Sequence, residues 1–317
     1  MNILVTGAAG FIGSHLCERL LAEEQHQVIG IDGFINPLLR SIKQRNLTTL
    51  LQHPRFTFIN ENLLTIDWKK ILINVDVIYH LAAMPGVRSS WGKDFDPYVI
   101  NNINVTQRLL EACRNSPIKK LIYISTSSIY GEVNGKVTED RTPSPLSPYG
   151  VTKLTGEYLC KVYQKTDNIP ITILRYFTVY GPRQRGDMAF HRFILHKLQN
   201  QPIPIYGNGK QTRDFTYVSD CVEATAAVLH ANNVIGETIN IGGKERASIL
   251  DIISIIEDIL GETVEVEFKE KPRGEPMHTW ADVTKAEKLL HYKPKISLEI
   301  GLKHELEDLK RLYQGGG

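Results

Sequence analysis

The sequence has little cysteine, almost no net charge and no long apolar run. Its four cysteines are scattered without Cys-x-x-Cys spacing and lie inside apolar helical patterns, which predicts buried free thiols in a reducing cytoplasm. A formal net charge of +2 argues against a nucleic-acid partner. No apolar stretch approaches the ~20 residues of a membrane helix, and no basic lead or cleavage site marks a secretory signal. We therefore expect a cytoplasmic protein with neither a nucleic-acid nor a membrane partner.

Two kinds of catalytic spacing are also missing. Histidine, cysteine and carboxylate residues nowhere follow one another with metal-ligand spacing, so no metal is expected. His80 ends an apolar run and is expected to be structural. No Gly-x-Ser-x-Gly elbow offers a serine nucleophile. The sequence therefore predicts neither metal-dependent nor serine-hydrolase chemistry.

What the chain does contain is a regular alternation of apolar strands and amphipathic helices. Its 317 residues, 42% of them hydrophobic, suffice for about two domains. The expected strands are Ile3–Thr6, Gln27–Ile31, Phe56–Asn60, Val75–His80, Lys120–Ser125 and Ile171–Arg175. The clearest expected helices are Phe11–Ala22, Pro97–Arg114 and Pro148–Lys165. Wholly apolar strands that alternate with helices predict an α/β fold with a parallel sheet covered on both faces.

After about residue 175 the pattern changes to loops rich in proline, glycine and arginine between short elements. These loops predict a smaller α/β substrate domain around a cleft, over 176–214 and 241–314. Segment 215–240 is expected to return to the first domain, 1–175. The glycines at 315–317 are expected to form a disordered tail.

Three glycines follow the first strand at intervals of three residues, and a helix begins at once. Gly7 allows a tight turn, Gly10 lets the backbone approach a pyrophosphate, and Gly13 lets the helix pack on the strand. Backbone N–H groups and the helix dipole then bind the phosphates. Asp32 follows about 20 residues later, where a carboxylate binds the ribose hydroxyls of NAD and repels the 2′-phosphate of NADP. Turn glycines and a solvated aspartate are the alternative, but the strand–turn–helix context favours a Rossmann-type, doubly wound NAD-binding domain.

Further motifs extend over nearly the whole chain. They are His80-Leu81-Ala82-Ala83, Asn102 to Thr106, Ser125–Gly131, Tyr149-x-x-x-Lys153, Arg175–Pro182, and Arg213-Asp214-Phe215 followed by Val218 to Asp220. With the Gly-x-x-Gly-x-x-Gly spacing, they make the chain resemble the extended short-chain dehydrogenases/reductases of the NAD-dependent epimerase/dehydratase family. The resemblance implies NAD contacts at Gly7, Ala9, Gly10, Phe11, Ile12, Gly13, Asp32, Leu63, Leu81, Ala82, Ala83, Asn102, Tyr149 and Lys153.

Tyr149 and Lys153 are spaced to project from one face of a helix that Ser147 caps and Pro148 begins. A phenol with a pKa of ~10 is a poor base at neutral pH. The ammonium and the positive nicotinamide of NAD⁺ are expected to lower the pKa of Tyr149 to about 7, which needs roughly 4 kcal/mol. Tyr149 would then take a hydroxyl proton while a hydride passes to the cofactor. The resemblance implies that Lys153 also holds the nicotinamide ribose, whereas spacing alone would equally fit a surface pair.

Thr126, Ser127 and Ser128 follow the fifth strand, at the sheet edge where ligands bind. Thr126 is expected to contact the reacting 4-hydroxyl. Dehydratases that resemble this chain carry Asp-Glu at positions 127 and 128, and sugar-nucleotide decarboxylases carry Glu at the second position. Two serines cannot act as proton-transfer carboxylates, which favours oxidation and re-reduction at C4 without elimination, and hence epimerisation. A serine-rich turn without chemistry is the alternative.

The segment after the sixth strand resembles UDP-glucuronic acid 4-epimerases in its Phe-Thr-Val-Tyr-Gly-Pro run and in an arginine, Arg185, before Asp-Met-Ala. Gly186 departs from that group, which commonly has proline there, and is expected to loosen the loop. A guanidinium binds a carboxylate with two parallel hydrogen bonds. The residues expected to hold the hexuronate carboxylate are Ser127, Ser128, Thr178 and Arg185, with Arg88 as a second arginine. For Arg185, a solvated charge or a diphosphate contact is the alternative.

By the same resemblance, Arg213 reaches the diphosphate, Tyr206 lies in the run that lines the uracil, and Arg273 with Glu275 forms a late UDP-binding loop. Surface charges beside proline and glycine are the alternative for the charged residues.

The resemblance as a whole implies NAD-dependent 4-epimerisation of a UDP-hexuronic acid, UDP-glucuronic acid, by a homodimer. The subunits would pair through the helices Pro97–Arg114 and Pro148–Lys165. The alternatives are a UDP-glucose/UDP-galactose 4-epimerase, a UDP-glucuronate decarboxylase and a non-catalytic NAD-binding protein.

Overall fold

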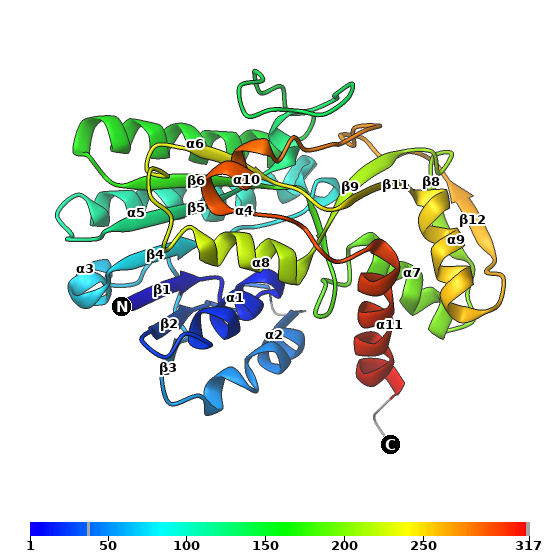
Figure 1. Cartoon of the computed structure of the whole chain (residues 1–317), viewed down its shortest axis with the longest axis horizontal. Coiled ribbons are helices and arrows are strands. Elements are labelled where there is room, and N and C mark those ends of the chain that lie inside the picture. The colour runs from blue at the N-terminus through cyan, green and yellow to red at the C-terminus, as the bar shows by residue number, and fades with distance from the viewer. Residues whose placement is uncertain (37–38, 315–317) are drawn as a thin grey trace.

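A seven-stranded sheet forms the centre of the computed structural model, which describes residues 1–36 and 39–314 (Figure 1). Its strands are β1 (Asn2–Thr6), β2 (Gln27–Ile31), β3 (Phe56–Ile59), β4 (Val77–His80), β5 (Lys120–Thr126), β6 (Ile171–Tyr176) and β10 (Thr238–Ile241). They are all parallel, in the order β10-β6-β5-β4-β1-β2-β3. The expected doubly wound α/β fold is confirmed, and the order reverses between β1 and β4, where such sheets bind ligands. The expected tail, 315–317, lies outside the described residues.

Helices cover both faces of this sheet, because its strand residues alternate between two buried clusters. In β1, Ile3 and Val5 belong to one cluster and Leu4 to the other. The first cluster includes α1 (Phe11–Leu21) and α8 (Val218–Ala227), and the second includes α5 (Val105–Cys113) and α6 (Pro148–Asp167). Burial on both faces explains the apolar strands. As expected, the cysteines in these four helices are buried and free: Cys17, Cys221, Cys113 and Cys160.

The expected helix over Pro97–Arg114 is confirmed, but it is not a regular α-helix throughout. A short α4 (Asp96–Tyr98) leads into a π-helical segment, η6 (Val99–Asn104), before α5 begins. Such wide turns are found mostly at functional sites, and the regular apolar spacing of a sequence does not reveal them. Here the π segment carries Asn102, whose side chain is buried against the rest of the site.

Two small sheets and some of the remaining helices build the other end of the molecule, whereas the other helices lie beside the large sheet (Figure 1). The additional strands are β7 (Thr178–Tyr180), β8 (Ile203–Tyr206), β9 (Thr212–Tyr217), β11 (Glu245–Ser248) and β12 (Val266–Lys269). The additional helices are α2 (Arg40–Leu47), α3 (Trp68–Ile71), α7 (Ala189–Leu198), α9 (Ile249–Leu260), α10 (Thr284–Leu290) and α11 (Leu298–Gln314). The small sheets have the orders β11-β9-β7 and β12-β8. Figure 1 shows α9, β8 and β12 gathered at the end away from β1–β3.

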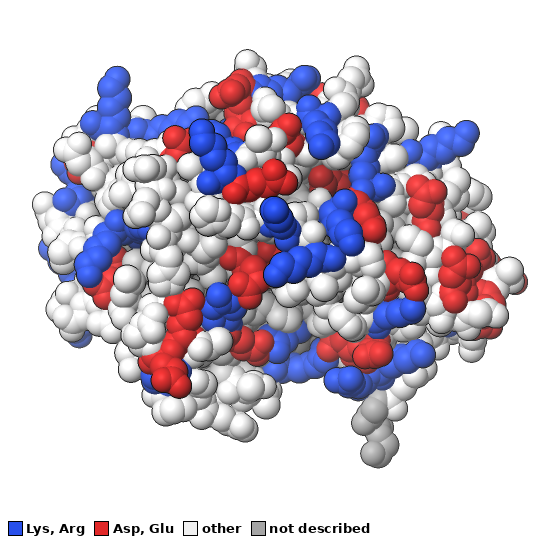
Figure 2. Space-filling view, in the orientation of Figure 1, with Lys and Arg blue, Asp and Glu red and all other residues white. Residues whose placement is uncertain are grey.

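The surface carries charges of both signs. Figure 2 shows Lys and Arg interspersed with Asp and Glu over the visible face, without a region of one sign. Within residues 1–36 and 39–314, no helix combines the length and the apolar character needed to cross a membrane.

Candidate active site

The glycine-rich turn after β1 is too tight for side chains. Gly7 has a φ of +74°, and a Cβ on it would lie 2.9 Å from the backbone nitrogen of Ala82. A Cβ on Gly13 would lie 2.2 Å from the carbonyl oxygen of Gly7, so Gly13 packs on the turn and not, as expected, on the strand. Gly10 is the N-cap of α1 and supplies no side-chain cap. The first N–H groups of α1 therefore face the position where a phosphate binds.

Asp32 follows β2 and carries the clearest mark of a ligand. Its Oδ1 accepts hydrogen bonds from the Phe34 N–H at 3.0 Å and from the Lys43 ammonium at 2.8 Å. Its Oδ2 is buried and has no hydrogen-bond partner within the described part of the chain. Buried polar atoms are nearly always paired, so this oxygen fits a donor from a ligand, such as a ribose hydroxyl. The turn and this carboxylate together fit NAD.

The loop after β4 lies against the glycine-rich turn. The Thr6 hydroxyl accepts a hydrogen bond from the Ala82 N–H at 3.2 Å. Asn102 holds the same loop: its Oδ1 accepts from the Met84 N–H at 2.7 Å, and its Nδ2 donates to the Met84 carbonyl and the Thr152 hydroxyl, both at 3.0 Å. Both amide hydrogens of Asn102 are thus used, which makes it a positioning residue.

The other expected cofactor contacts lie around this cradle. Ala9 lies in the turn, and Phe11 and Ile12 begin α1. Leu81 and Ala83 lie in the loop after β4, and Leu63 follows β3. Leu63 packs in the second buried cluster with Leu4 and Ile31 of the neighbouring strands.

Tyr149 lies in the first turn of α6, which begins as the sequence predicts. The Ser147 hydroxyl accepts a hydrogen bond from the Gly150 N–H, and a proline occupies the first turn. Burial raises the pKa of Tyr149 above its ordinary value, whereas a hydrogen bond with Thr126 and the Arg185 charge lower it. In the chain without a cofactor, desolvation outweighs both favourable contacts, and the predicted lowering of the pKa of Tyr149 depends on bound NAD⁺.

Lys153 lies one turn further along α6 and is buried. Its Nζ is 4.3 Å from the ring centre of Tyr123. Burial lowers the pKa of Lys153 to about 8, against the raising effects of Cys160 and Glu157. The ammonium is therefore close to its titration range and depends on its surroundings to stay protonated.

Thr126 ends β5, and Ser127 and Ser128 begin the short 3₁₀ turn that follows it, against α6. Thr126 caps it: its hydroxyl accepts from the Ser128 N–H and donates to the Ser128 hydroxyl, both at 3.2 Å. Ser127 and Ser128 are half-buried. A Cβ on Gly150 would lie 2.6 Å from the Ser128 carbonyl oxygen, so a glycine is required for this close approach. The turn is thereby held beside Tyr149.

Two neighbours of Tyr149 complete the centre of the site. The Tyr98 ring packs edge-on to it, with centroids 6.2 Å apart, and the Tyr98 hydroxyl lies 2.9 Å from the Pro85 and Gly86 carbonyl oxygens. Arg185 is close enough to lower the pKa of Tyr149, and its guanidinium forms two 2.9 Å bonds with Asp187. Sequence reasoning did not identify Tyr98.

A buried ion pair behind the site was also missed. The Glu157 carboxylate binds the Arg175 guanidinium at 3.0 and 2.7 Å and accepts from the Ser125 hydroxyl at 2.5 Å. Both charged side chains are almost fully buried. Glu157 follows Lys153 by one helical turn. This spacing is the feature of the sequence from which Glu157 could have been predicted.

Tyr206, Arg213 and Glu275, which were expected at the nucleotide end, come together in the structure. Arg88, which was expected at the hexuronate carboxylate, lies with them. The Arg88 guanidinium stacks 4.1 Å from the ring centre of Tyr206, and its Nε lies 2.5 Å from a Glu275 oxygen. The other Glu275 oxygen is 3.7 Å from Arg213. A second guanidinium, that of Arg192 on α7, lies 5.1 Å from the centre of the Tyr206 ring. The sequence analysis did not identify Arg192.

The last two expected substrate residues lie at the edges of these groups. Arg273 stacks 4.7 Å from the ring centre of Trp91. Thr178 begins β7, is half-buried, and pairs with Phe215 of β9, two residues from Arg213.

His80 is a structural residue, as expected. Its two ring nitrogens lie 2.8 Å from the Thr6 hydroxyl and 3.2 Å from the Thr106 hydroxyl. Burial, and secondarily the Lys153 charge, lowers the pKa of His80 to about 3, so the imidazole is neutral.

Known proteins resemble this chain over almost its full length. The sequence model of the NAD dependent epimerase/dehydratase family matches residues 3–242. The Bacillus subtilis protein named uncharacterized UDP-glucose epimerase YtcB is 61% identical over 99% of this chain and 100% of that protein. The UDP-glucuronate 4-epimerase of Thermodesulfobacterium geofontis is 39% identical over 95% of this chain and 93% of that protein.

A solved structure adds the fold to this comparison. UDP-glucuronic acid 4-epimerase from Bacillus cereus, in complex with UDP-glucuronic acid and NAD, has a TM-score of 0.98 and 58% identity, covering 99% of this chain and 100% of that one. The resemblance seen in the motifs is confirmed, and the chain belongs to the NAD dependent epimerase/dehydratase family.

Proposed function

We propose that this protein is an NAD-dependent UDP-glucuronic acid 4-epimerase that produces UDP-galacturonic acid. The observation that carries the proposal is the surroundings of Tyr149, which is in contact with Thr126 and near Arg185, beside two serines where a dehydratase would need carboxylates. The name and bound ligands of the 58% identical Bacillus cereus enzyme support the same activity.

Tyr149 acts as the base that removes the proton of the C4 hydroxyl and later returns it. NAD⁺, when bound, supplies a reversible hydride acceptor for C4 and one further positive charge in the site. Burial holds the pKa of Tyr149 high, so the chain alone keeps the phenol neutral. Thr126 and Arg185 both favour the phenolate, and the buried Lys153 lies on the same helix face.

The hexuronate carboxylate needs a fixed orientation, because a 4-keto hexuronate loses CO₂ when its carboxylate stands perpendicular to the ketone. Arg185 is the candidate that holds it, with the Ser127 and Ser128 hydroxyls and Thr178. Arg185 already binds the Asp187 carboxylate with two parallel hydrogen bonds, which is the arrangement that a hexuronate carboxylate would need. The hexuronate would replace Asp187 there.

These contacts fit a chain in which one part binds NAD and the other part binds the UDP-sugar. The large sheet holds the NAD cradle, with 215–240 returning to it through α8 and β10. The segments 176–214 and 241–314 supply most of the nucleotide end, where Arg213, Arg192 and the Arg88–Glu275 pair surround Tyr206. Two or three guanidinium groups suit a UDP diphosphate.

A second candidate is a UDP-glucose/UDP-galactose 4-epimerase, because the 61% identical Bacillus subtilis protein carries the name UDP-glucose epimerase. That reaction requires no carboxylate clamp. The same base, cofactor and nucleotide-binding residues would serve both sugars. The two substrates would differ only in the group that lies against Arg185, a carboxylate in the hexuronate and a neutral hydroxymethyl group in the hexose.

The test is to incubate the purified full-length protein with UDP-glucuronate, with and without added NAD⁺, and to separate the products by anion-exchange chromatography. UDP-galacturonate is the expected product, and Tyr149→Phe is expected to abolish turnover while UDP-sugar binding remains. A UDP-pentose with CO₂ would identify a decarboxylase. Preferential turnover of UDP-glucose would favour the second candidate, and binding without turnover would indicate a non-catalytic protein.

We also propose that the protein works as a cytoplasmic homodimer. Val151, Tyr158 and Val162 form one stripe along α6 and are 47%, 55% and 54% exposed. Exposed apolar stripes of this kind are typical of helix–helix interfaces between subunits. The four buried free thiols suit a reducing compartment.

A further inference from the structure

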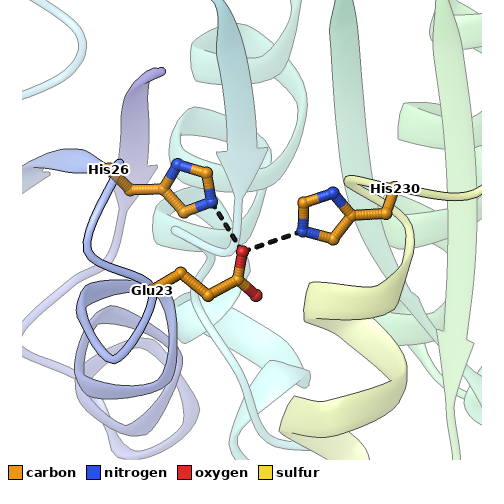
Figure 3. Close-up of side chains that lie close together, drawn as sticks. All are labelled: Glu23, His26 and His230. Atoms are coloured by element: carbon orange, nitrogen blue, oxygen red, sulfur yellow. Dashed lines mark hydrogen bonds and ion pairs between the residues drawn. The ribbon is translucent and has the colours of Figure 1, made fainter.

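Three side chains that the reaction does not use meet at the opposite edge of the large sheet (Figure 3). Glu23 follows α1, His26 directly precedes β2, and His230 follows α8. These are positions at the amino ends of the strands, whereas the candidate active site lies at their carboxyl ends. Glu23 and His230 are 207 positions apart in the sequence.

The three side chains point toward one another. The Nε2 atoms of His26 and His230 each lie 2.9 Å from the same oxygen of Glu23, Oε2. The ligand atoms of the three residues are all within 4.8 Å of one another. In a tetrahedral zinc site with ligands about 2.0–2.2 Å from the metal, the ligand atoms lie roughly 3.3–3.6 Å apart, so both nitrogens would move slightly away from Oε2 as the ion replaces the two hydrogen bonds. His230, with its side chain 51% exposed, has the freedom to make that movement.

Two half-buried cations, Arg55 and Lys120, hold the backbone that carries these side chains. The Arg55 guanidinium donates to the carbonyl oxygens of Leu21, Glu23 and His26, at 2.7 to 2.8 Å. The Lys120 ammonium donates to three carbonyl oxygens around His230, those of Val228, Leu229 and Ala231, at 2.8 to 2.9 Å. Metal sites are built on such preorganised supports.

A neighbouring charged side chain binds the other oxygen of Glu23 and leaves Oε2 available to a metal ion. Arg19 binds the other oxygen, Oε1, at 3.0 Å and is itself paired with Glu223 at 2.7 Å. Two carboxylates therefore face one guanidinium, while Arg55 and Lys120 are engaged by backbone carbonyls. The Gln25 amide, 3.3 Å from Oε2, is a weak competitor on the exposed side.

His26 is the most deeply buried member of the group. Its ring is completely buried, and its Nδ1 has no hydrogen-bond partner within residues 1–36 and 39–314. The hydrogen bond between its Nε2 and Glu23 therefore directs this buried ring toward the other two side chains.

We propose that Glu23, His26 and His230 form a binding site for a divalent transition-metal ion of the Zn²⁺ type, outside the proposed epimerase function. Two imidazoles and one carboxylate select such an ion over Mg²⁺ or Ca²⁺, which prefer oxygen ligands. The ion joins the α1–β2 turn to the end of α8. It serves as a structural staple, because the site is remote from the residues that act on the sugar.

The experiment is a calorimetric titration of the chelator-treated full-length protein with Zn²⁺ alone, accompanied by thermal unfolding with and without the ion. We expect one Zn²⁺ per chain and a higher Tm in its presence, since an ion that binds only the folded state stabilises it. His230→Ala is expected to weaken binding at least about tenfold, as loss of even a supporting residue does at metal sites. Mg²⁺ is expected not to raise the Tm.

The matched control is His196→Ala, which removes an exposed histidine on α7 and is expected to leave Zn²⁺ binding unchanged. Turnover of UDP-sugar is expected to be the same in His230→Ala and the wild type, so loss of the proposed reaction and loss of the metal site are distinguishable. Absence of Zn²⁺ binding, or equal affinity in wild type and His230→Ala, would overturn the proposal. Glu23→Gln gives a second variant if His230→Ala does not fold.

Discussion

Glu157 lies one helical turn beyond Lys153 on α6, and its carboxylate helps to keep that buried ammonium protonated. Burial is the larger effect and lowers the pKa of Lys153 to about 8, while Cys160 and Glu157 raise it. The same carboxylate is bound by Arg175 and by the Ser125 hydroxyl, next to Thr126. One buried group thus connects the helix that carries Tyr149 and Lys153 to the carboxyl ends of β5 and β6.

Replacement of Glu157 by Gln is expected to move the alkaline limb of the kcat/KM profile to lower pH. Loss of the carboxylate removes an effect that raises the pKa of Lys153, so the ammonium is lost earlier as the pH rises. The measurement is the pH dependence of UDP-glucuronate turnover. Ser125→Ala is the control, because it removes the 2.5 Å hydrogen bond without a change of charge. An alkaline limb that moves equally in both variants would contradict this role.

Asp32→Asn is expected to weaken NAD binding about 10- to 100-fold, since hydrogen bonds to a charged group contribute ~1.5–3 kcal/mol. NADP binding is expected to hold or improve, because the charge that repels a 2′-phosphate is lost and Lys43 loses its partner. Calorimetric titration of the cofactor-stripped protein with each dinucleotide measures both. Asp258→Asn, at an exposed position of α9, is the matched control. Equal losses for NAD and NADP would argue against a ribose contact.

Gly150→Ala is expected to lower kcat about a hundredfold without loss of NAD binding. The added Cβ would lie 2.6 Å from the Ser128 carbonyl oxygen, so the turn that carries Thr126 must move away from Tyr149. Alanine is the better helix former, so α6 itself is not weakened. Gly186→Ala is the control, because the nearest atom to its Cβ would be 3.8 Å away. Unchanged kcat in Gly150→Ala would show that the close approach is dispensable.

The stability of the fold is expected to fall as the pH rises from about 4 to 6 because of Asp214. Burial raises the pKa of Asp214 from 3.8 to about 6, against hydrogen bonds from the Gly243 and Ala281 N–H groups. The folded chain therefore binds this proton more tightly than the unfolded chain, and its contribution to stability is lost through that window. Urea unfolding measures this effect, because the wild type is expected to lose stability relative to Asp214→Asn as the pH rises through this window. A difference independent of pH would contradict the shift.

Tyr158→Glu is expected to convert the dimer to a monomer, because it places a charge in the middle of the apolar stripe on α6. Light scattering after size-exclusion chromatography gives the mass directly. Glu299→Gln, on the exposed side of α11, is the control and should leave the mass unchanged. A wild type that is monomeric at micromolar concentration would rule out the interface.

Local features of the sequence were enough to predict the elements and the chemistry that depend on neighbours along the chain. The apolar strands predicted the parallel sheet, the glycine spacing predicted the turn of Gly7, and the cap at Ser147 predicted the start of α6. Each follows from local backbone geometry or from the burial of a repeating pattern, so the spacing of letters is sufficient.

Features that depend on packing between distant segments emerge only in the folded molecule. The π turn at Asn102 and the raised pKa of Tyr149 both follow from how neighbouring elements bury these residues. The Glu23–His26–His230 group has no spacing along the chain that would reveal it, because its members lie up to 207 positions apart. Desolvation and contact across the sheet are properties of the folded molecule, and these settle which ordinary residues become a site.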